Sequence, residues 1–182
     1  MDLTLTSHPD SPAPAVQGLT ATIARTDKGV SVRYELRGNL GELVIPELLA
    51  PVRADELWKH TCFELFIRRT DGTSYVEFNM APTGHWAAYS FERPRSGMKN
   101  IAEVERIPIG TLTTDDAFIL RTEIDLSDVK GLPDGEWTVA VTTVVEAADG
   151  KRSYWALAHP QGKADFHHID GFVLKLPASE VP

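Results

Sequence analysis

The chain is built from short segments in which apolar and polar residues alternate with a period of two. Such alternation predicts β-strands that bury one face and leave the other in solvent. Turn-forming residues separate the segments, a pattern typical of antiparallel sheets. The predicted strands are residues 19–24, 30–36, 62–67, 75–80, 85–91, 101–109, 117–126, 136–146, 153–158 and 171–176. About nine or ten strands, with no long amphipathic helix, predict an all-β fold, an antiparallel β-sandwich.

The N-terminal residues differ in composition from this alternating part. Residues 1–15 are rich in Ser, Pro, Ala and Asp, which favours a flexible arm over a packed element. Residues 16–182 are enough for one domain with a sizeable core and few for two. We therefore predict an arm followed by a single domain.

The most informative stretch is the pair of segments on either side of a Pro-Thr-Gly turn at residues 82–84. This turn suits a three-residue hairpin loop with Gly in the left-handed conformation. Counting outward from it places Met80 opposite Trp86 on an apolar face. The same register places Glu77 opposite Tyr89 on the other face. A slip of one residue would instead move Trp86 to the polar face and Tyr89 into the core.

The second face of this hairpin combines aromatic rings with polar groups. It carries Tyr75, Glu77, Asn79 and Tyr89, and Glu64 joins them if its strand is the neighbour. Aromatic rings stack on sugar faces, and carboxylates and amides bind hydroxyl groups. This face therefore predicts a binding surface for a carbohydrate or sugar-like metabolite. The alternative is a second core layer in which Tyr75 and Tyr89 pack and Glu77 bonds to a nearby loop.

Residues outside the hairpin are expected to complete this site. Trp155 offers a third stacking ring. The polar loop at residues 159–170 is expected to close over the face and to supply Lys163 and His167 as polar contacts. This loop carries three His and two Asp residues. Their spacing matches no compact metal motif, so we expect no metal site.

Haem is an alternative ligand, because Met and His can serve as its axial ligands. Met98 lies in a basic loop that could approach the propionates, and His167 is available in the polar loop. The chain has no Cys-x-x-Cys-His motif, so a haem would be held non-covalently. We expect no cofactor, with haem as the alternative.

Glu64 and Glu77 could also form the acid–base pair of a glycoside hydrolase. Carboxylates on neighbouring strands reach the separations of about 5–9 Å that these enzymes use. Such pairs are more often structural groups with hydrogen-bonded neighbours, so we predict a binding module without enzymatic activity. Cys62 has no evident activating charge and is expected to be a small buried residue. A domain that only mediates assembly, with its aromatic residues buried between chains, is the other alternative.

Composition narrows the class of protein further. The 182 residues carry a net charge of −8, which argues against a nucleic-acid-binding surface. No apolar run approaches a membrane span, and the N-terminus has no signal-peptide pattern. A single cysteine excludes an internal disulfide framework. These features favour a cytoplasmic protein that binds a small molecule and contacts neither membrane nor nucleic acid.

Several stretches resemble a known family. They are WKHTCFELF at 58–66, YVEFN at 75–79, PTGHWAAY at 82–89, YWALAHP at 154–160 and GKADFHH at 162–168. Together they resemble the bacterial DOMON-like proteins, which are related to the family-nine carbohydrate-binding modules. The resemblance runs from about residue 53 to residue 172, with Ala164 where that group has Pro. It implies a jelly-roll or immunoglobulin-like β-sandwich that binds a small ligand, with sugars and haem as the ligands of the wider superfamily.

Overall fold

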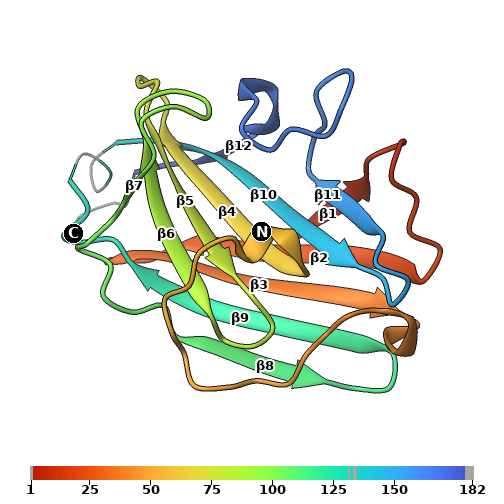
Figure 1. Ribbon diagram of the computed structural model, residues 1–182. Coiled ribbons are helices and arrows are strands. Elements are labelled where there is room, and N and C mark those ends of the chain that lie inside the picture. Colours follow the sequence, from red (N-terminus) through yellow and green to blue (C-terminus); the bar gives the residue numbers. More distant parts are fainter. Residues whose placement is uncertain (1, 131, 133–134, 179–182) are drawn as a thin grey trace.

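The computed structural model describes residues 2–130, 132 and 135–178, and these form an all-β structure (Figure 1). The strands are β1 (Asp2–Ser7), β2 (Val16–Arg25), β3 (Gly29–Gly38), β4 (Cys62–Arg69), β5 (Tyr75–Met80), β6 (Trp86–Phe91), β7 (Lys99–Asn100), β8 (Ile109–Thr113), β9 (Ala117–Asp125), β10 (Trp137–Glu146), β11 (Arg152–Ala156) and β12 (Leu174–Leu176). The helical elements of the described residues are three 3₁₀ turns, η1 (Leu40–Glu42), η2 (Leu57–Lys59) and η3 (Ile169–Gly171).

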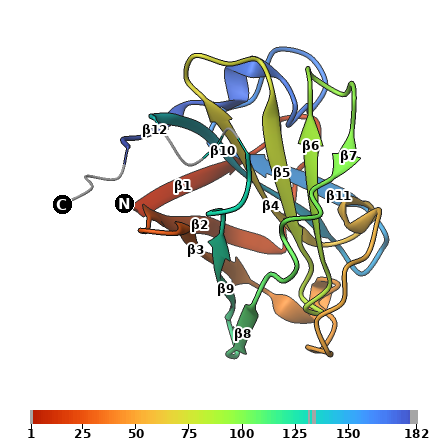
Figure 2. The ribbon, with the colours of Figure 1, turned by 90° about the vertical axis from the view of Figure 1, so that its left-hand side faces the viewer.

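All strands belong to one antiparallel sheet that folds over on itself. The order across the sheet is β7-β6-β5-β4-β10-β11-β1-β2-β3-β9-β8, and β12 pairs with β10. Strand β1 forms the fold line, because Leu5 pairs with Leu19 of β2 while Thr6 pairs with Ala156 of β11. The two halves of the sheet therefore lie against each other as layers (Figure 2).

Three expectations about the strands need correction. The flexible arm expected at residues 1–15 is a strand over Asp2–Ser7, and Met1 lies outside the described residues. Leu5 of this strand is buried, so the segment is held by apolar packing as well as by its two neighbours. In place of the strand expected at 101–109, residues 101–108 form a loop whose apolar side chains reach the core; strand β7 precedes it and β8 begins at Ile109. The described residues thus form twelve strands rather than nine or ten.

The central hairpin has the predicted register. Met80 pairs with Trp86 and Glu77 with Tyr89, as the turn chemistry indicated. Gly84 adopts a φ of 85°, and its N–H donates to the Ala81 carbonyl to close the turn. A left-handed residue at this position is why glycine is needed there.

The core lies between the two halves of the sheet. Phe63 of β4 stacks on Phe118 of β9 with ring centres 5.7 Å apart. The Tyr34 hydroxyl of β3 donates a 2.7 Å hydrogen bond to the Glu64 carbonyl of β4. These contacts join opposite layers, so the inward-facing side of β4 is fixed relative to β3 and β9. The outward-facing side of β4, which carries the Glu64 side chain, is fixed with it.

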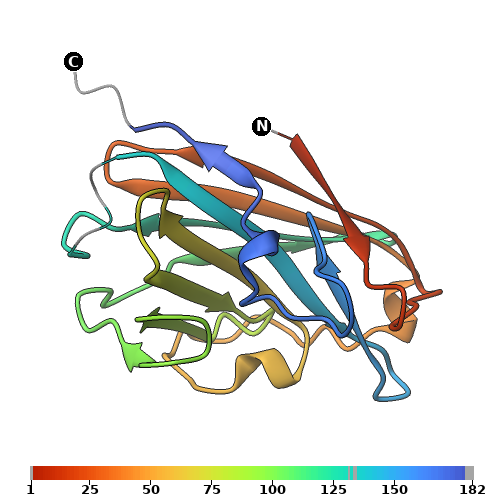
Figure 3. The same cartoon turned by 90° about the horizontal axis from the view of Figure 1, so that it is seen from above.

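A second apolar cluster covers the outer face of β4, β5 and β6. Its buried members are Phe66, Tyr75, Ala87, Tyr89, Phe91, Ala140 and Phe172. The chain between β11 and β12, which includes η3, lies over β10 (Figure 3), and its residue Phe172 belongs to this cluster. His167 in that chain packs edge-on against Phe66, with ring centres 5.4 Å apart. This outer layer and its covering loop enclose the candidate site.

Candidate functional site

A cavity of about 430 Å³ opens on the outer face of the half-sheet that contains β4, β5 and β10. The residues that line it come from five strands, from η2 and from the loops that follow β6 and β11. They are Trp58, Glu64, Glu77, Phe91, Arg95, Met98, Val144, Arg152, Tyr154, Ala164, Phe166 and His167. Charged, aromatic and aliphatic groups thus meet in one hollow of the size that small ligands occupy.

The Glu64 carboxyl lies at the floor of this cavity. Its side chain points outward from β4 because Phe63 and Leu65 point into the core. The residue is only 2% exposed. The Thr142 hydroxyl of β10 donates to Oε2 at 3.4 Å, and Oε1 has no hydrogen-bond partner among the described residues. An unpaired buried carboxyl oxygen is costly, so this atom is a candidate contact for a ligand.

Glu77 supplies the second carboxyl of the floor from β5. Asn79 donates from Nδ2 to Oε1 of Glu77 at 2.7 Å. Asn79 also pairs in register with Glu64, so the amide lies between the two carboxyl groups. Its Oδ1 atom is buried without a partner in the described chain.

Both carboxyl groups bind protons more tightly than an exposed glutamate does. Burial raises the pKa of Glu64 well above its usual range, and the neighbouring charge of Glu77 raises it further. Burial raises the pKa of Glu77 to about 7. The physical cause is the loss of hydration of the charged form, which disfavours ionisation in a closed site. At neutral pH the floor therefore retains protons that it can exchange when a ligand binds.

His167 forms the wall next to Glu77. The Tyr75 hydroxyl and Nδ1 of His167 are 2.7 Å apart, and the Arg95 backbone N–H donates to the same hydroxyl oxygen at 3.2 Å. The arrangement that satisfies these groups has the hydroxyl donating to Nδ1, which leaves the ring proton on Nε2. Nε2 lies 3.9 Å from Oε2 of Glu77, too far for a direct hydrogen bond.

His167 is neutral in this setting. Burial lowers its pKa to about 4, and the positive charge of Arg95 acts in the same direction. A neutral imidazole whose Nε2–H points towards a carboxyl can bridge to that carboxyl through a ligand hydroxyl.

Aromatic rings line the walls above the floor. Tyr154 and Phe166 meet at 69° with ring centres 6.0 Å apart. Trp58 packs edge-on against Tyr89, with ring centres 6.2 Å apart. Trp58, Tyr154 and Phe166 are partly exposed at the cavity. Rings with an accessible face are what stacking on a sugar requires.

Two arginines stand at the mouth of the cavity. Arg95 has a left-handed φ of 57° and forms an ion pair with Asp165, with Nη2 and Oδ1 2.8 Å apart. Arg152 donates to the Lys59 carbonyl at 3.4 Å. It has no carboxylate partner within the described part of the chain. The mouth of the cavity therefore carries guanidinium groups, whereas its floor carries carboxyl groups.

The predicted site residues fall into distinct positions. Glu64, Glu77 and His167 line the cavity, and Asn79 lies directly behind its floor. Tyr75 and Tyr89, expected as stacking surfaces, are only 3% and 2% exposed and belong to the packed outer cluster. The packing alternative describes their rings better, because Tyr75 stacks at 4.8 Å on Phe91 and the Tyr89 hydroxyl donates to Asp55.

Trp155 and Lys163, also expected at the site, do not line the cavity. Trp155 packs in the core between the layers, so its ring has no face towards the cavity. Its neighbour Tyr154 points the other way along β11 and lines the cavity instead. Lys163 is exposed in the loop after β11 and does not line the cavity.

Several residues that line the cavity were not predicted from the sequence. Among them are Trp58, Arg95, Arg152, Tyr154 and Phe166. Strand alternation could have identified Tyr154, since only one of two successive residues on a strand faces the core. Arg95 and Phe166 come from loops whose paths have no short-range sequence signal.

The structure also bears on metal binding, on the reactivity of Cys62 and on membrane-spanning helices. Among the described residues, no cluster of three or more His, Cys, Asp and Glu side chains could hold a metal ion. Cys62 is fully buried next to Glu64, and burial raises its thiol pKa well above the usual range. The thiol is therefore a small buried group rather than a nucleophile. In the part of the chain that the structure describes, no helix has the length and hydropathy to cross a membrane.

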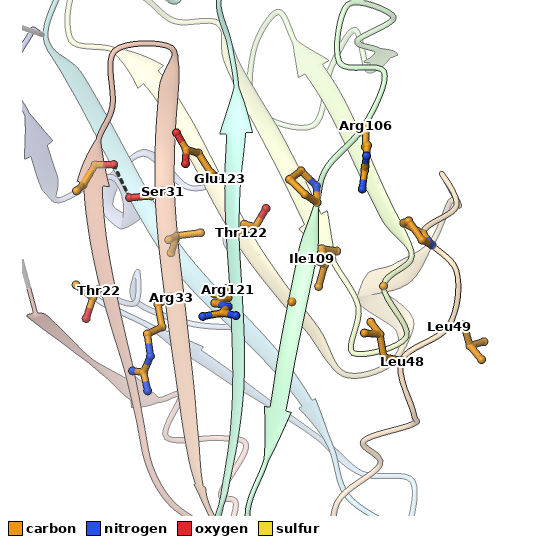
Figure 4. A pocket seen from close by; sticks show the side chains of 16 residues that line it. Thr22, Ser31, Arg33, Leu48, Leu49, Arg106, Ile109, Arg121, Thr122 and Glu123 are labelled. Carbon is orange, nitrogen blue, oxygen red and sulfur yellow. Dashed lines mark hydrogen bonds between the residues drawn. The ribbon is translucent and has the colours of Figure 1, made fainter.

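A second hollow, of about 690 Å³, lies across the other half of the sheet (Figure 4). One row of its lining runs from Thr22 through Arg33 and Arg121 to Gly110, directly across β2, β3, β9 and β8. Arg33 is engaged with Glu35 at 2.6 Å. None of its lining residues is a buried carboxylate and none is aromatic. It therefore lacks the features that distinguish the first cavity.

No protein-family model and no curated protein matches the chain. A candidate carbohydrate-binding protein from Bacteroides uniformis ATCC 8492 matches with a TM-score of 0.67 and 14% identity, over 98% of this chain and 86% of that one. A family-nine carbohydrate-binding module from Caldicellulosiruptor kristjanssonii in complex with glucose matches with a TM-score of 0.52 and 12% identity, over 88% and 76%.

These likenesses establish the class of fold. At such low identity they show a shared all-β architecture and nothing about individual residues. The relation to family-nine modules that the sequence resemblance implied is confirmed at the level of the fold. Membership of the DOMON-like group stays a prediction.

Proposed function

We propose that this protein binds a sugar-like small molecule in the cavity above Glu64 and Glu77. The observation that carries the proposal is the combination of accessible aromatic walls with a buried polar floor. That floor contains a carboxyl oxygen, Oε1 of Glu64, for which the described chain provides no partner. The likeness in fold to a carbohydrate-binding protein and to a module in complex with glucose supports the same ligand class.

Each part of the cavity has a role in this proposal. Tyr154, Phe166 and Trp58 stack on the apolar faces of the sugar ring. Glu64 and Glu77 bond to its hydroxyl groups, and Nε2–H of His167 donates to an oxygen placed between it and Glu77. The DOMON-like resemblance belongs to this proposal too, since it implies a small ligand of the same kind.

The proposal is tested by a ligand screen followed by calorimetry. A thermal-shift panel of monosaccharides, disaccharides and nucleotide sugars identifies ligands, because binding to the native state raises the melting temperature. Tyr154→Ala is expected to weaken binding of the best ligand about tenfold, the equivalent of one lost stacking contact. Tyr89→Phe is the matched control, since its hydroxyl bonds to Asp55 away from the cavity. The proposal fails if no sugar binds or if both variants bind equally well.

Hydrolysis is not part of the proposal. A glycoside hydrolase requires one carboxyl that is ionised and one that is protonated. Burial shifts the pKa of both Glu64 and Glu77 in the same direction, whereas an acid–base pair needs the two values pushed apart. Turnover of aryl glycosides that Glu64→Gln or Glu77→Gln abolishes would establish an enzyme instead.

Haem fits the cavity less well than a sugar does. Met98 and His167 both line it, which is the observation in favour of haem. The floor beneath them carries two carboxyl groups, and the flat apolar face of a porphyrin would leave these groups without hydrogen-bond partners. His167 is also held through Nδ1 by Tyr75, with Nε2 facing Glu77. A Soret band that appears with added haemin, and is lost in Met98→Leu or His167→Gln, would favour haem.

A further inference from the structure

The floor of the cavity contains oxygen atoms for which the described residues provide no hydrogen-bond partner. Oε1 of Glu64 and Oδ1 of Asn79 are buried and have no partner among the described residues. Oε2 of Glu77 lies 3.9 Å from Nε2 of His167, beyond hydrogen-bonding distance. Three oxygen atoms at adjacent positions on β4 and β5 therefore lack a hydrogen-bond partner in the described chain.

These three atoms belong to one site. Glu64 and Asn79 are direct partners in register, and Glu77 is the next residue of β5 on the same face. The Asn79 amide connects the two carboxyl groups through its 2.7 Å bond to Glu77. A single chemical group placed above Asn79 would be close to both carboxyls.

No charged side chain of the described chain pairs directly with the two carboxyl groups of this floor. Arg95 of the β6–β7 loop lines the cavity, and Asp165 already pairs with its guanidinium. Arg152 of β11 lines the mouth and donates to a backbone carbonyl. His167 is neutral, and the buried Cys62 thiol beside Glu64 is neutral too. In the described chain, neither carboxyl of the floor forms an ion pair with Lys or Arg.

From this arrangement we infer that the ligand is an amino sugar, whose ammonium group binds between Glu64, Asn79 and Glu77. An ammonium group has three N–H donors and no acceptor, which complements these three oxygens once a carboxyl has released its proton. Its positive charge forms charge-assisted hydrogen bonds that a neutral hydroxyl cannot form. The aromatic walls of Trp58, Tyr154 and Phe166 also favour a cation, through the electron-rich faces of their rings.

The inference includes a proton balance. Without ligand, the floor retains protons on its carboxyl groups; when the ammonium group binds, one carboxyl ionises and releases its proton to solvent. The ammonium group keeps its three protons and no covalent bond changes. A neutral sugar leaves the carboxyl protons in place. Proton release on binding therefore distinguishes the two kinds of ligand.

The inference rests on the proposed function and is tested by calorimetry with three probes. Glucosamine, glucose and N-acetylglucosamine are titrated into the full chain at about pH 6.5, in buffers that differ in ionisation enthalpy. We expect glucosamine to bind about tenfold more tightly than glucose, as charged hydrogen bonds imply, with release of close to one proton. N-Acetylglucosamine, which has no ammonium group, is expected to bind no more tightly than glucose and to release none.

Two variants complete the experiment. Glu64→Gln replaces an acceptor by a side chain that is also a donor, so the preference for glucosamine over glucose should disappear along with the proton release. Glu47→Gln, in an exposed loop, is the matched control and should retain both. A far-ultraviolet circular dichroism spectrum and melting curve establish that each variant is folded.

The possible outcomes distinguish the amino-sugar inference from the broader proposal that the protein binds a sugar. If glucose binds and glucosamine binds equally or more weakly, the amino-sugar inference is overturned while sugar binding stands. If glucosamine binds best but Glu64→Gln keeps the preference, the ammonium site is not at this floor and the inference is likewise overturned. If none of the three probes binds and no other sugar does, both proposals fall.

Discussion

Nη2 of Arg95 lies 2.8 Å from Oδ1 of Asp165, and this ion pair joins the β6–β7 loop to the loop after β11 at the mouth of the cavity. The two side chains are 62% and 35% exposed, so water screens the pair. Arg95 holds this position with a left-handed φ of 57°, a conformation that non-glycine residues rarely adopt. Arg95 therefore combines a weak ion pair with a strained backbone conformation.

Arg95→Gly and Asp165→Asn are expected to differ in stability although both remove this ion pair. Loss of the pair should lower the free energy of unfolding by less than about 1 kcal/mol in either variant. Glycine also relieves the left-handed strain, so Arg95→Gly should be more stable than Asp165→Asn by roughly 1 kcal/mol. Urea unfolding of the two variants measures the difference. Equal stabilities would show that the left-handed residue carries no strain.

Successive residues of β11 are expected to respond in opposite ways. Trp155→Ala should lower the free energy of unfolding by about 3–5 kcal/mol, because its ring fills the core. Tyr154→Ala should cost much less stability, since the ring is partly exposed at the cavity, and should instead weaken ligand binding. Chemical denaturation and calorimetry on both variants check this pair. A Tyr154 variant as unstable as the Trp155 variant would contradict the assigned orientation of β11.

Tyr34→Phe is expected to loosen the contact between the two layers. The variant keeps the ring but removes the 2.7 Å hydrogen bond to the Glu64 carbonyl. A buried hydrogen bond of this kind contributes about 1 kcal/mol, so the free energy of unfolding should fall by about that amount. Urea unfolding gives the value, with Tyr154→Phe as a control at a partly exposed tyrosine. No change in Tyr34→Phe would mean that the hydroxyl does not link the layers.

The pH dependence of stability depends on groups with opposing effects. The pKa of Glu77 is about 7 in the folded chain and 4.5 without burial, so between these values the folded state keeps a proton that the unfolded state has lost. The free energy of unfolding therefore falls as pH rises through this window, and Glu64, whose pKa is also raised, acts in the same direction. His167 has its pKa lowered from 6.5 to about 4, so its contribution rises with pH between these values.

Single variants should separate these contributions between pH 4.5 and 6.5. His167→Gln removes the rising contribution, so its stability should fall more steeply than that of the wild type, by about 1.4 kcal/mol per pH unit. Glu77→Gln removes a falling contribution and should change the slope by a similar amount in the other direction. Urea unfolding at half-unit steps of pH measures both slopes. Parallel curves for all three proteins would show that these groups titrate normally in the fold.

Local chemistry made the central hairpin predictable. The Pro-Thr-Gly turn determines the pairing of Met80 with Trp86, and period-two alternation then assigns every side chain of β5 and β6 to a face. The positions of Glu64 and Glu77 on one surface followed from the same rule. These features depend on residues within a few positions of each other, which is the range over which sequence patterns act.

The rest of the site depends on contacts that are distant in sequence. Tyr154 reaches the cavity because it pairs with Val144 of β10, which faces outward beside Cys62 of β4. Arg95 and Asp165 lie in loops 70 residues apart that only the folded sheet brings together. Tyr75 and Tyr89 lie on the predicted face of the sheet, but they are buried in the outer apolar cluster and are packing residues. Alternation assigns a side chain to a face, and only tertiary packing determines whether that face is open.

The fold line at β1 also has a consequence for how the chain reaches its folded state. The Thr6 hydroxyl meets the Ala156 carbonyl across 150 residues of sequence, so the contact between β1 and β11 is among the least local in the molecule. Contacts of such long range slow folding, because loop closure must precede any gain from pairing. During synthesis on the ribosome, β1 emerges before β11, so the edge of β1 that pairs with β11 has no partner until β11 has been made. We expect the closing of this seam to be a late step of folding, with the outer edge of β1 open to solvent until then.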